Sequence, residues 1–243
     1  MKPTLTVVIL TRLANSVLSR HLNILGIADE VIIVSDQEPK KFNLPKKVKI
    51  FHHPLGNNFA SQRNFALSKV ETDWILFIDD DEFLTKSLIS EIRDALNFKG
   101  VVGFRLRRID SFYDQPLRFG ESGKTNLLRL AKANAGSWKR RVHETWQVKG
   151  KVIDLLNPID HRRSDLTSGF IQRMAFYSPI DSLSLNQEGK KFSYYRLLFY
   201  PLGKLVRNYF LFFGFLDGLL GLFHVYLMMI QSFTVRIYQW ENS

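Results

Sequence analysis

Short apolar runs alternate with segments of helical periodicity along the first 100 residues. The apolar runs, each short enough for a buried strand, cover 5–10, 31–34, 48–51 and 74–78. The segments whose apolar residues recur at helical spacing cover 15–25, 59–70 and 84–96. Because strands that alternate with helices build parallel sheets, this pattern predicts a doubly wound α/β sheet whose strands end along one edge.

The pattern changes after residue 100. Residues 101–108 alternate like a strand with one polar face, and 127–130 form another short apolar segment. Glycine-containing loops lie between and after them. We expect this second half, 101–165, to complete a mixed sheet with 1–100, so that 1–165 forms one α/β domain.

The C-terminal region, 166–243, has a third texture and is expected to be a helical appendage. Residues 192–200 are aromatic and basic, and 209–230 are almost wholly apolar apart from Asp217 and His224. The apolar stretch is long enough to span a bilayer, but a mid-segment aspartate costs about 2.5–3.5 kcal/mol there. Flanking lysines, arginines and aromatics favour helices lying in a membrane interface. A buried hairpin or a homo-oligomer interface is the alternative.

The composition shows a net positive charge and excludes cysteine chemistry. The chain has 243 residues, 45% of them hydrophobic, which is enough for a substantial core. It has no cysteine, so disulfides, thiolate metal sites and a cysteine nucleophile are excluded, and a reducing compartment fits. The N-terminal apolar run is too short for a signal peptide. A net charge of +11 indicates an anionic partner, and without a zinc-finger or single-strand-binding signature a nucleic acid is not expected.

Four consecutive acids, 79–82, follow the strand predicted at 74–78. They therefore lie at the carboxyl end of a strand, the edge at which open α/β sheets bind ligands. Carboxylates this close repel one another unless a cation joins them, and such oxygen clusters suit Mg²⁺ or Mn²⁺, which can hold a diphosphate. The alternative is a solvated acidic turn that begins the next helix.

Several motifs occur together and in a particular order. They are Val8-Ile9-Leu10-Thr11, Ala28 to Asp36, Asn58 to Leu67 with its Gln62-Arg63-Asn64 element, and Asp73 to Glu82 with its Asp-x-Asp element. In this order and spacing the chain resembles the family 2 glycosyltransferases, which have the GT-A fold. Val142-His143-Glu144 and Leu216-Asp217-Gly218 also resemble elements of the lipopolysaccharide core β-glucosyltransferase-like branch.

The resemblance implies a nucleotide-sugar site on the first half of the chain. Thr11 and Asp36 would border the base and ribose, and Arg63 would approach the nucleotide. Asp79 would lie near the ribose, with Asp80 in the same site. Two stretches depart from the family pattern on this side, since 11–15 lacks the usual acid and the usual aspartate after the second strand is displaced by one residue, to Asp36.

The resemblance also implies a metal and a general base. Asp81 would bind Mg²⁺ or Mn²⁺ that holds the donor diphosphate, and His161 would approach that metal or the diphosphate. Glu144 would be the base that takes a proton from the acceptor hydroxyl. A structural ion pair with Arg140 or Arg141 is the alternative role for Glu144.

Together these implications predict an inverting, metal-dependent glycosyltransferase. It would move a hexose from a nucleoside-diphosphate sugar to a hydroxyl of a glycolipid or lipid-linked saccharide of the cell envelope. The basic, aromatic C-terminal region predicts peripheral or monotopic attachment to the cytoplasmic face of the membrane. A nucleotidyltransferase and a non-catalytic membrane-surface protein with the same fold are the rivals. The absence of a glycine-rich phosphate loop with a lysine argues against the first, and the intact acids argue against the second.

Overall fold

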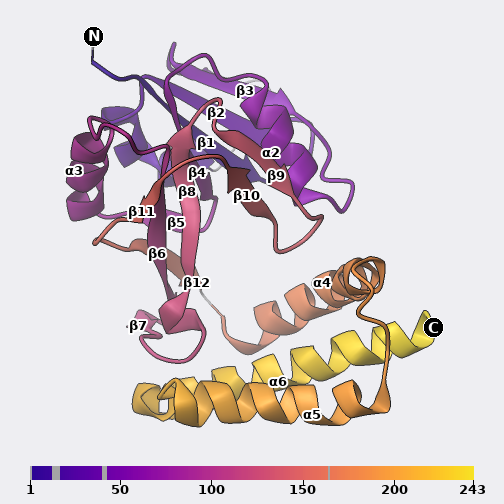
Figure 1. The fold of residues 1–243 in the computed structure, drawn as a ribbon. Helices are drawn as coiled ribbons and strands as arrows, with labels where there is room; N and C mark the ends of the chain where they lie inside the picture. Colours follow the sequence, from indigo (N-terminus) through magenta and orange to yellow (C-terminus); the bar gives the residue numbers. More distant parts are fainter. Residues whose placement is uncertain (1, 13–16, 40–42, 164) are drawn as a thin grey trace. The chain divides into compact units, whose positions relative to one another are not determined.

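The computed structural model describes residues 2–12, 17–39, 43–163 and 165–243 (Figure 1). The strands are β1 (Leu5–Thr11), β2 (Glu30–Ser35), β3 (Val48–His52), β4 (Trp74–Asp79), β5 (Glu82–Leu84), β6 (Gly103–Phe112), β7 (Gln115–Pro116), β8 (Asn126–Lys132), β9 (Gly136–Lys139), β10 (Thr145–Val148), β11 (Val152–Asp154) and β12 (Ile159–Arg163). The α-helices are α1 (Val17–Arg20), α2 (Phe59–Leu67), α3 (Lys86–Ala95), α4 (Thr167–Gln187), α5 (Tyr194–Val206) and α6 (Gly218–Glu241). Shorter helical turns are η2 (Leu22–Gly26), η3 (Ser122–Lys124), η4 (Arg207–Leu211) and η5 (Gly214–Asp217).

The main sheet is mixed, as the sequence predicts. Its strand order is β3-β2-β1-β4-β8-β6-β12-β5, and β7 and β11 also pair with β6. β1 lies parallel to β2 and β4, and β2 lies parallel to β3, whereas β8 is antiparallel to both β4 and β6. The four predicted N-terminal strands are therefore confirmed, and they form the parallel part of the sheet.

The helix predicted over 84–96 begins two residues later, at Lys86. Leu84 instead ends β5, because β5 pairs antiparallel with β12 through Leu84 and Ile159. Thr85 is the N-cap of α3, and its hydroxyl accepts a hydrogen bond from the amide of Leu88 at 3.1 Å. The helix predicted over 15–25 is a short α-helix followed by a 3₁₀ turn, and its first two residues lie outside the described part of the chain.

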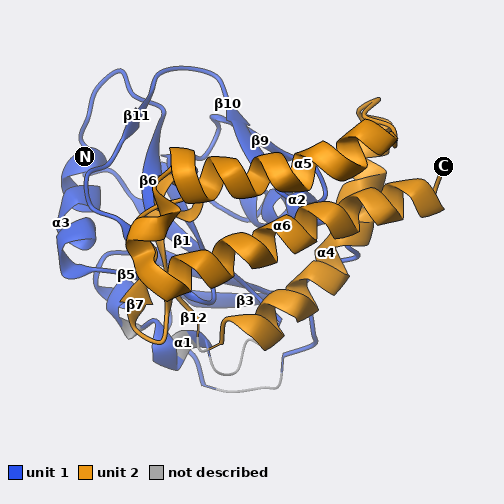
Figure 2. Cartoon of the chain, turned by 90° about the horizontal axis from the view of Figure 1, so that it is seen from below, with its two compact units in different colours: residues 1–107, 126–161 blue, residues 108–125, 162–243 orange. Residues whose placement is uncertain are grey.

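The chain divides into two compact units (Figure 2). Unit 1 comprises residues 1–107 and 126–161, and unit 2 comprises 108–125 and 162–243. In unit 1, alternate side chains of β1 enter two separate apolar cores. One core includes Leu88 and Ile92 of α3, and the other includes Ala60 and Ala66 of α2. Both faces of the parallel strands are thus covered, as their uninterrupted apolar sequence requires.

In unit 2, α6 packs against both α4 and α5. The apolar stretch 209–230 is not one element, because η4 ends at Leu211 and η5 begins at Gly214. Phe213, between them, has a left-handed backbone with φ of 58°. Within the described residues, one helical stretch, Gly214–Glu241, is long and apolar enough to cross a membrane by length and composition alone.

Asp217 holds a loop of unit 2 rather than standing alone in an apolar helix. Its carboxylate accepts hydrogen bonds from the backbone amides of Arg118 at 3.2 Å and Phe119 at 3.0 Å. Two further contacts hold the same loop: the amide of Glu121 donates to Asn208, and the Ser122 hydroxyl bonds His224. The segment 108–125, which comprises the end of β6 and the chain that leads to β8, is therefore built into unit 2.

Replacing Asp217 with alanine should loosen this loop. The substitution removes the acceptor of two backbone amides, one hydrogen bond exposed and one part-buried, each of which contributes about 0.5–1.5 kcal/mol. We expect faster hydrogen exchange at the amides of Arg118 and Phe119, while the amides of β1 in unit 1 keep their rates. Unchanged protection at both loop amides would contradict this role for Asp217.

Candidate functional site

The acids predicted to form a ligand site lie in the turn that joins β4 to β5. Asp79 is the last residue of β4, and Asp80 and Asp81 form the turn. Because β1 and β4 are parallel and in register from Leu5–Trp74 to Leu10–Asp79, Thr11 reaches the same edge. The Thr11 hydroxyl donates a hydrogen bond to Asp80 Oδ2 at 2.7 Å. The structure therefore brings Thr11 and the acidic turn together.

His21 supports this turn through contacts that the sequence did not predict. It is fully buried, its Nε2 bonds the backbone carbonyl of Asp80 at 3.1 Å, and its ring stacks on Phe83 at 4.9 Å. Burial lowers the pKa of His21 below its usual value, against the opposing effect of that hydrogen bond. Burial also raises the pKa of Asp80; the Thr11 hydrogen bond opposes this rise, and the Asp81 charge adds to it.

Asp81 and His161 form a pair that suits a divalent cation. His161 Nε2 lies 2.9 Å from Asp81 Oδ2, because β12 pairs with β5 and places His161 opposite Glu82. The histidine is 2% exposed, whereas the aspartate side chain is 38% exposed. Among the described residues, no group of three or more histidine and acidic side chains could enclose a metal. One carboxylate and one imidazole fit Mg²⁺ or Mn²⁺ only if substrate phosphates and water supply the other ligands.

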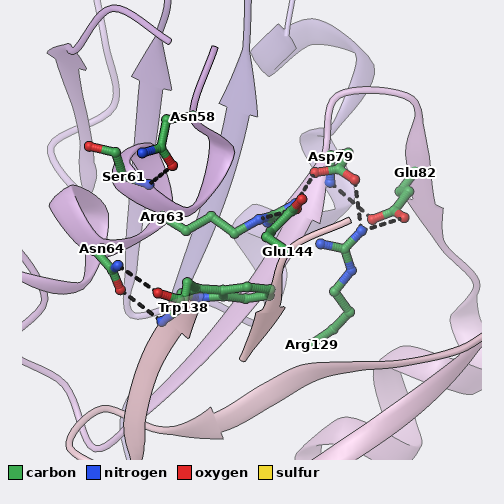
Figure 3. A network of polar contacts seen from close by, with 9 residues as sticks. All are labelled: Asn58, Ser61, Arg63, Asn64, Asp79, Glu82, Arg129, Trp138 and Glu144. Carbon is green, nitrogen blue, oxygen red and sulfur yellow. Dashed lines mark hydrogen bonds and ion pairs between the residues drawn. The ribbon is translucent and has the colours of Figure 1, made fainter. Parts of the chain in front are cut away.

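Arg63 joins the expected base to the acidic turn (Figure 3). Its Nε donates to Glu144 Oε1 and its Nη2 donates to Asp79 Oδ1, both at 2.8 Å. The guanidinium is 2% exposed and lies 4.6 Å from the centre of the Trp138 ring. Among the described residues, the ion-pair partner of Glu144 is Arg63, and not Arg140 or Arg141, the alternatives that the sequence offers. Residues 63, 79 and 144, which are far apart in sequence, therefore form one contiguous polar network.

Arg129 extends this network and was not singled out from the sequence. Its Nη2 donates to Asp79 Oδ2 at 2.7 Å and to Glu82 Oε1 at 3.0 Å. Glu82 is fully buried and also accepts from the backbone amide of Asp79 at 3.0 Å. Burial alone would lower the pKa of Arg129, but the two carboxylates raise it, so the guanidinium stays charged. Its signal in the sequence is a lone arginine inside the apolar run 127–131.

Asp36 follows β2 at the same edge of the sheet. Its Oδ1 accepts a hydrogen bond from the amide of Leu55 at 2.6 Å, and its own amide donates to the carbonyl of Thr11 at 2.9 Å. The displaced aspartate is thus fixed between the end of β1 and the loop that follows β3. Its role in binding a ribose stays a prediction, as do the roles of Thr11, Arg63, Asp79 and Asp80 in binding a nucleotide sugar.

The two tryptophans near Glu144 belong to a separate hairpin of unit 1. β9 and β10 pair antiparallel, with Trp138 opposite Trp146. Both rings are buried, stack on each other at 5.2 Å and meet Phe77 edge-on. Both rings therefore pack in the apolar core on this face of the sheet. Glu144 lies in the turn of this hairpin, so the rigid aromatic pair fixes the position of its backbone.

Comparisons with known proteins identify the family and the fold. Residues 7–147 match the sequence model of glycosyl transferase family 2. An uncharacterized glycosyltransferase of Rickettsia typhi is 27% identical over 92% of this chain and 84% of its own length. A second, from Rickettsia conorii, is 26% identical over 92% of this chain and 87% of its own length. The solved mannosyltransferase PcManGT from Pyrobaculum calidifontis, in complex with GDP-Man and Mn²⁺, is 11% identical with a TM-score of 0.55, covering 100% of this chain and 89% of its own.

Proposed function

The chain belongs to glycosyl transferase family 2 and has the GT-A fold, and from this premise we propose a specific transfer reaction. It moves a hexose from a nucleoside-diphosphate sugar to a hydroxyl of a glycolipid or lipid-linked saccharide, with inversion at the anomeric carbon. The observation that carries the proposal is the network of Glu144, Arg63 and Asp79 beside the Asp81–His161 pair. The proposed base and the proposed metal pair belong to two sets of side chains that share the acidic turn, in which Asp79 and Asp81 are two residues apart. We also propose that the chain belongs to the lipopolysaccharide core β-glucosyltransferase-like branch of the family, because it contains the Val142-His143-Glu144 element.

Asp81 and His161 are proposed to hold Mg²⁺ or Mn²⁺ together with the donor diphosphate. When bound, the cation supplies positive charge that stabilises the departing nucleoside diphosphate. Thr11, Asp36 and Asp80 are proposed to orient the nucleotide at the edge of the sheet formed by the ends of β1, β2 and β4. The GDP-Man and Mn²⁺ bound to the Pyrobaculum protein, which shares the fold, support this choice of ligands.

Glu144 is proposed to take the proton from the acceptor hydroxyl. One of its oxygens, Oε1, accepts from Arg63, and within the described residues Oε2 accepts no hydrogen bond, so it is available to the hydroxyl. As the proton moves to Glu144, the acceptor oxygen bonds the anomeric carbon and the bond from that carbon to the phosphate oxygen breaks. The leaving diphosphate keeps the bonding electrons. Because the acceptor oxygen itself attacks the anomeric carbon, no covalent intermediate with the protein forms.

The product formed from the donor tests this proposal. Purified protein, a panel of nucleotide sugars, Mn²⁺ and an extract of envelope glycolipids should release nucleoside diphosphate and add a sugar to lipid. Release of pyrophosphate would instead identify the nucleotidyltransferase rival. Intact donor in every reaction, from folded protein, would support the non-catalytic rival.

Unit 2 is proposed to attach the protein to a membrane surface at its cytoplasmic face. On α6 the exposed apolar side chains recur every three or four residues, at 219, 223, 226, 230, 233, 237 and 240. On the adjoining α5 a second exposed stripe includes 195, 198, 199, 202 and 206. Figure 2 shows the two helices side by side. Apolar stripes next to lysines and arginines suit helices that lie in the interface of an anionic membrane.

Two polar substitutions in these stripes should weaken membrane binding. Leu198 and Phe223 are 60% and 52% exposed, so replacing both with serine costs little folding energy. We expect affinity for phosphatidylglycerol-containing vesicles to fall roughly tenfold or more in co-sedimentation. The matched control replaces two exposed apolar residues of unit 1, Phe98 and Leu156, and should bind as wild type does. Equal losses in both variants, or dimers without vesicle binding, would contradict membrane attachment.

A further inference from the structure

A basic hollow lies in unit 1 at the start of α2, beside the β9–β10 turn. Its volume is about 620 Å³, and none of its ten lining residues is acidic. They are His53, Asn58, Ala60, Ser61, Asn64, Phe65, Trp138, Lys139, Arg140 and Arg141. Lys139 and Arg141 border this concave surface as exposed cations, and its lining supplies no carboxylate, which favours an anionic ligand. The hollow shares no residue with the proposed donor site of Thr11, Asp36, Arg63, Asp79 to Asp81 and His161.

The walls of the hollow are held in place by hydrogen bonds. The side chain of Asn64 accepts from the amide of Trp138 at 2.9 Å and donates to its carbonyl at 3.0 Å. The carbonyl of Arg141 accepts from the amide of Phe59, the first residue of α2, at 2.9 Å. These bonds join the basic turn to the helix, so the cations are presented by a fixed backbone. In the same turn, Arg140 and His143 have left-handed backbones, with φ of 72° and 50°.

The hollow also lies next to the proposed general base. Trp138 forms part of its lining, and the same indole ring covers the guanidinium of Arg63, which holds Glu144. Along the chain, Arg141 precedes Glu144 by three residues in the same turn. The Trp138 ring and the Arg63 guanidinium therefore link the lining of the hollow to the carboxylate that is expected to deprotonate the acceptor.

We propose that this hollow binds a phosphate group on the acceptor saccharide and so presents a neighbouring hydroxyl to Glu144. The inference rests on the proposed glycosyl transfer and names the chemical class of its acceptor. Lysine and arginine are the side chains that recognise phosphate, arginine through two parallel N–H donors and lysine as a point charge. Ser61, exposed at the start of α2, adds a hydroxyl donor.

The test is a binding measurement with glucose 6-phosphate as the probe and glucose as its uncharged counterpart. Calorimetry gives affinities for wild type, for Lys139→Gln/Arg141→Gln and for a control of equal charge change, Lys149→Gln/Lys151→Gln. Lys149 and Lys151 are exposed cations of unit 1 that do not line the hollow. In protein labelled with 5-fluorotryptophan, fluorine NMR reports which of the four tryptophans senses the probe.

We expect saturable binding of glucose 6-phosphate that shifts the Trp138 resonance. The affinity for glucose 6-phosphate should fall about tenfold or more in Lys139→Gln/Arg141→Gln and stay unchanged in the control. Binding should also persist when nucleoside diphosphate and Mn²⁺ are present. Failure to bind the probe, or equal binding of glucose, would overturn the proposal. Competition by nucleoside diphosphate, or loss in Asp81→Ala, would assign the anion to the donor and overturn it too. If the probe binds at Trp138 but no sugar is ever transferred, the proposed function fails while the anion site remains.

Discussion

Replacing Arg129 with methionine is expected to lower the free energy of unfolding by about 3–5 kcal/mol. The substitution removes the cation between two carboxylates, and one of them, Glu82, is fully buried. A buried charge that loses its partner retains the cost of its desolvation without the compensating attraction. Chemical denaturation followed by circular dichroism measures the change, provided that unfolding is two-state.

An exposed ion pair of the same chemistry provides the control. Arg105 donates to Asp154 at 2.7 Å, but the two side chains are 44% and 51% exposed. Arg105→Met should therefore cost less than about 1 kcal/mol. The double variant Glu82→Gln/Arg129→Met should recover part of the stability lost in Arg129→Met, because the unpaired carboxylate is gone. Equal losses for Arg129→Met and Arg105→Met would contradict a supporting role for the buried network.

Replacing Glu144 with glutamine is expected to reduce the rate of sugar transfer by about 10²–10⁴-fold. The amide is nearly isosteric and its oxygen can still accept from Arg63, but it cannot take a proton from the acceptor hydroxyl. Binding of the donor should change little, because the amide oxygen keeps the contact with Arg63, and Glu144 contacts neither Asp81 nor His161 among the described contacts. The measurement is the steady-state release of nucleoside diphosphate, with donor affinity determined separately.

A glutamate far from the network separates loss of the base from a general effect of lost charge. Glu71 is exposed, and Glu71→Gln should transfer sugar at the wild-type rate. If Glu144→Gln retained more than about a tenth of wild-type activity, a carboxylate other than Glu144 would be the base. Loss of donor binding in Glu144→Gln would assign this residue to the donor site instead.

The residues that the sequence does predict are those that follow strands with a clear apolar pattern. The acidic turn after β4 and Asp36 after β2 lie at the expected edge because parallel strands place their carboxyl ends together. The family motifs include Arg63, Glu144 and His161, and the structure adds the contacts that these side chains make. Arg63 bonds Glu144, and His161 bonds Asp81.

Other parts of the site depend on strand pairing, which a local pattern does not specify. Arg129 reaches Asp79 because β8 pairs antiparallel with β4, with Leu76 opposite Leu130. His21 supports the acidic turn through a contact between residues 59 positions apart. The break between η4 and η5 within 209–230 also involves a distant partner, because the carbonyl of Phe212 accepts from the amide of Gly120 at 2.9 Å. Hydropathy alone reads that stretch as continuous.

Calorimetric titration of nucleoside diphosphates tests the central claim, a metal-assisted donor site at Asp81, most directly. Each nucleotide is titrated with Mn²⁺ and again with a chelator, into wild type, Asp81→Ala and the exposed control Asp94→Ala. We predict that wild type and Asp94→Ala bind at least one nucleotide only with Mn²⁺, and that Asp81→Ala loses this binding. Folded wild-type protein that binds none of them, or Asp81→Ala that binds as tightly as wild type, would contradict the account.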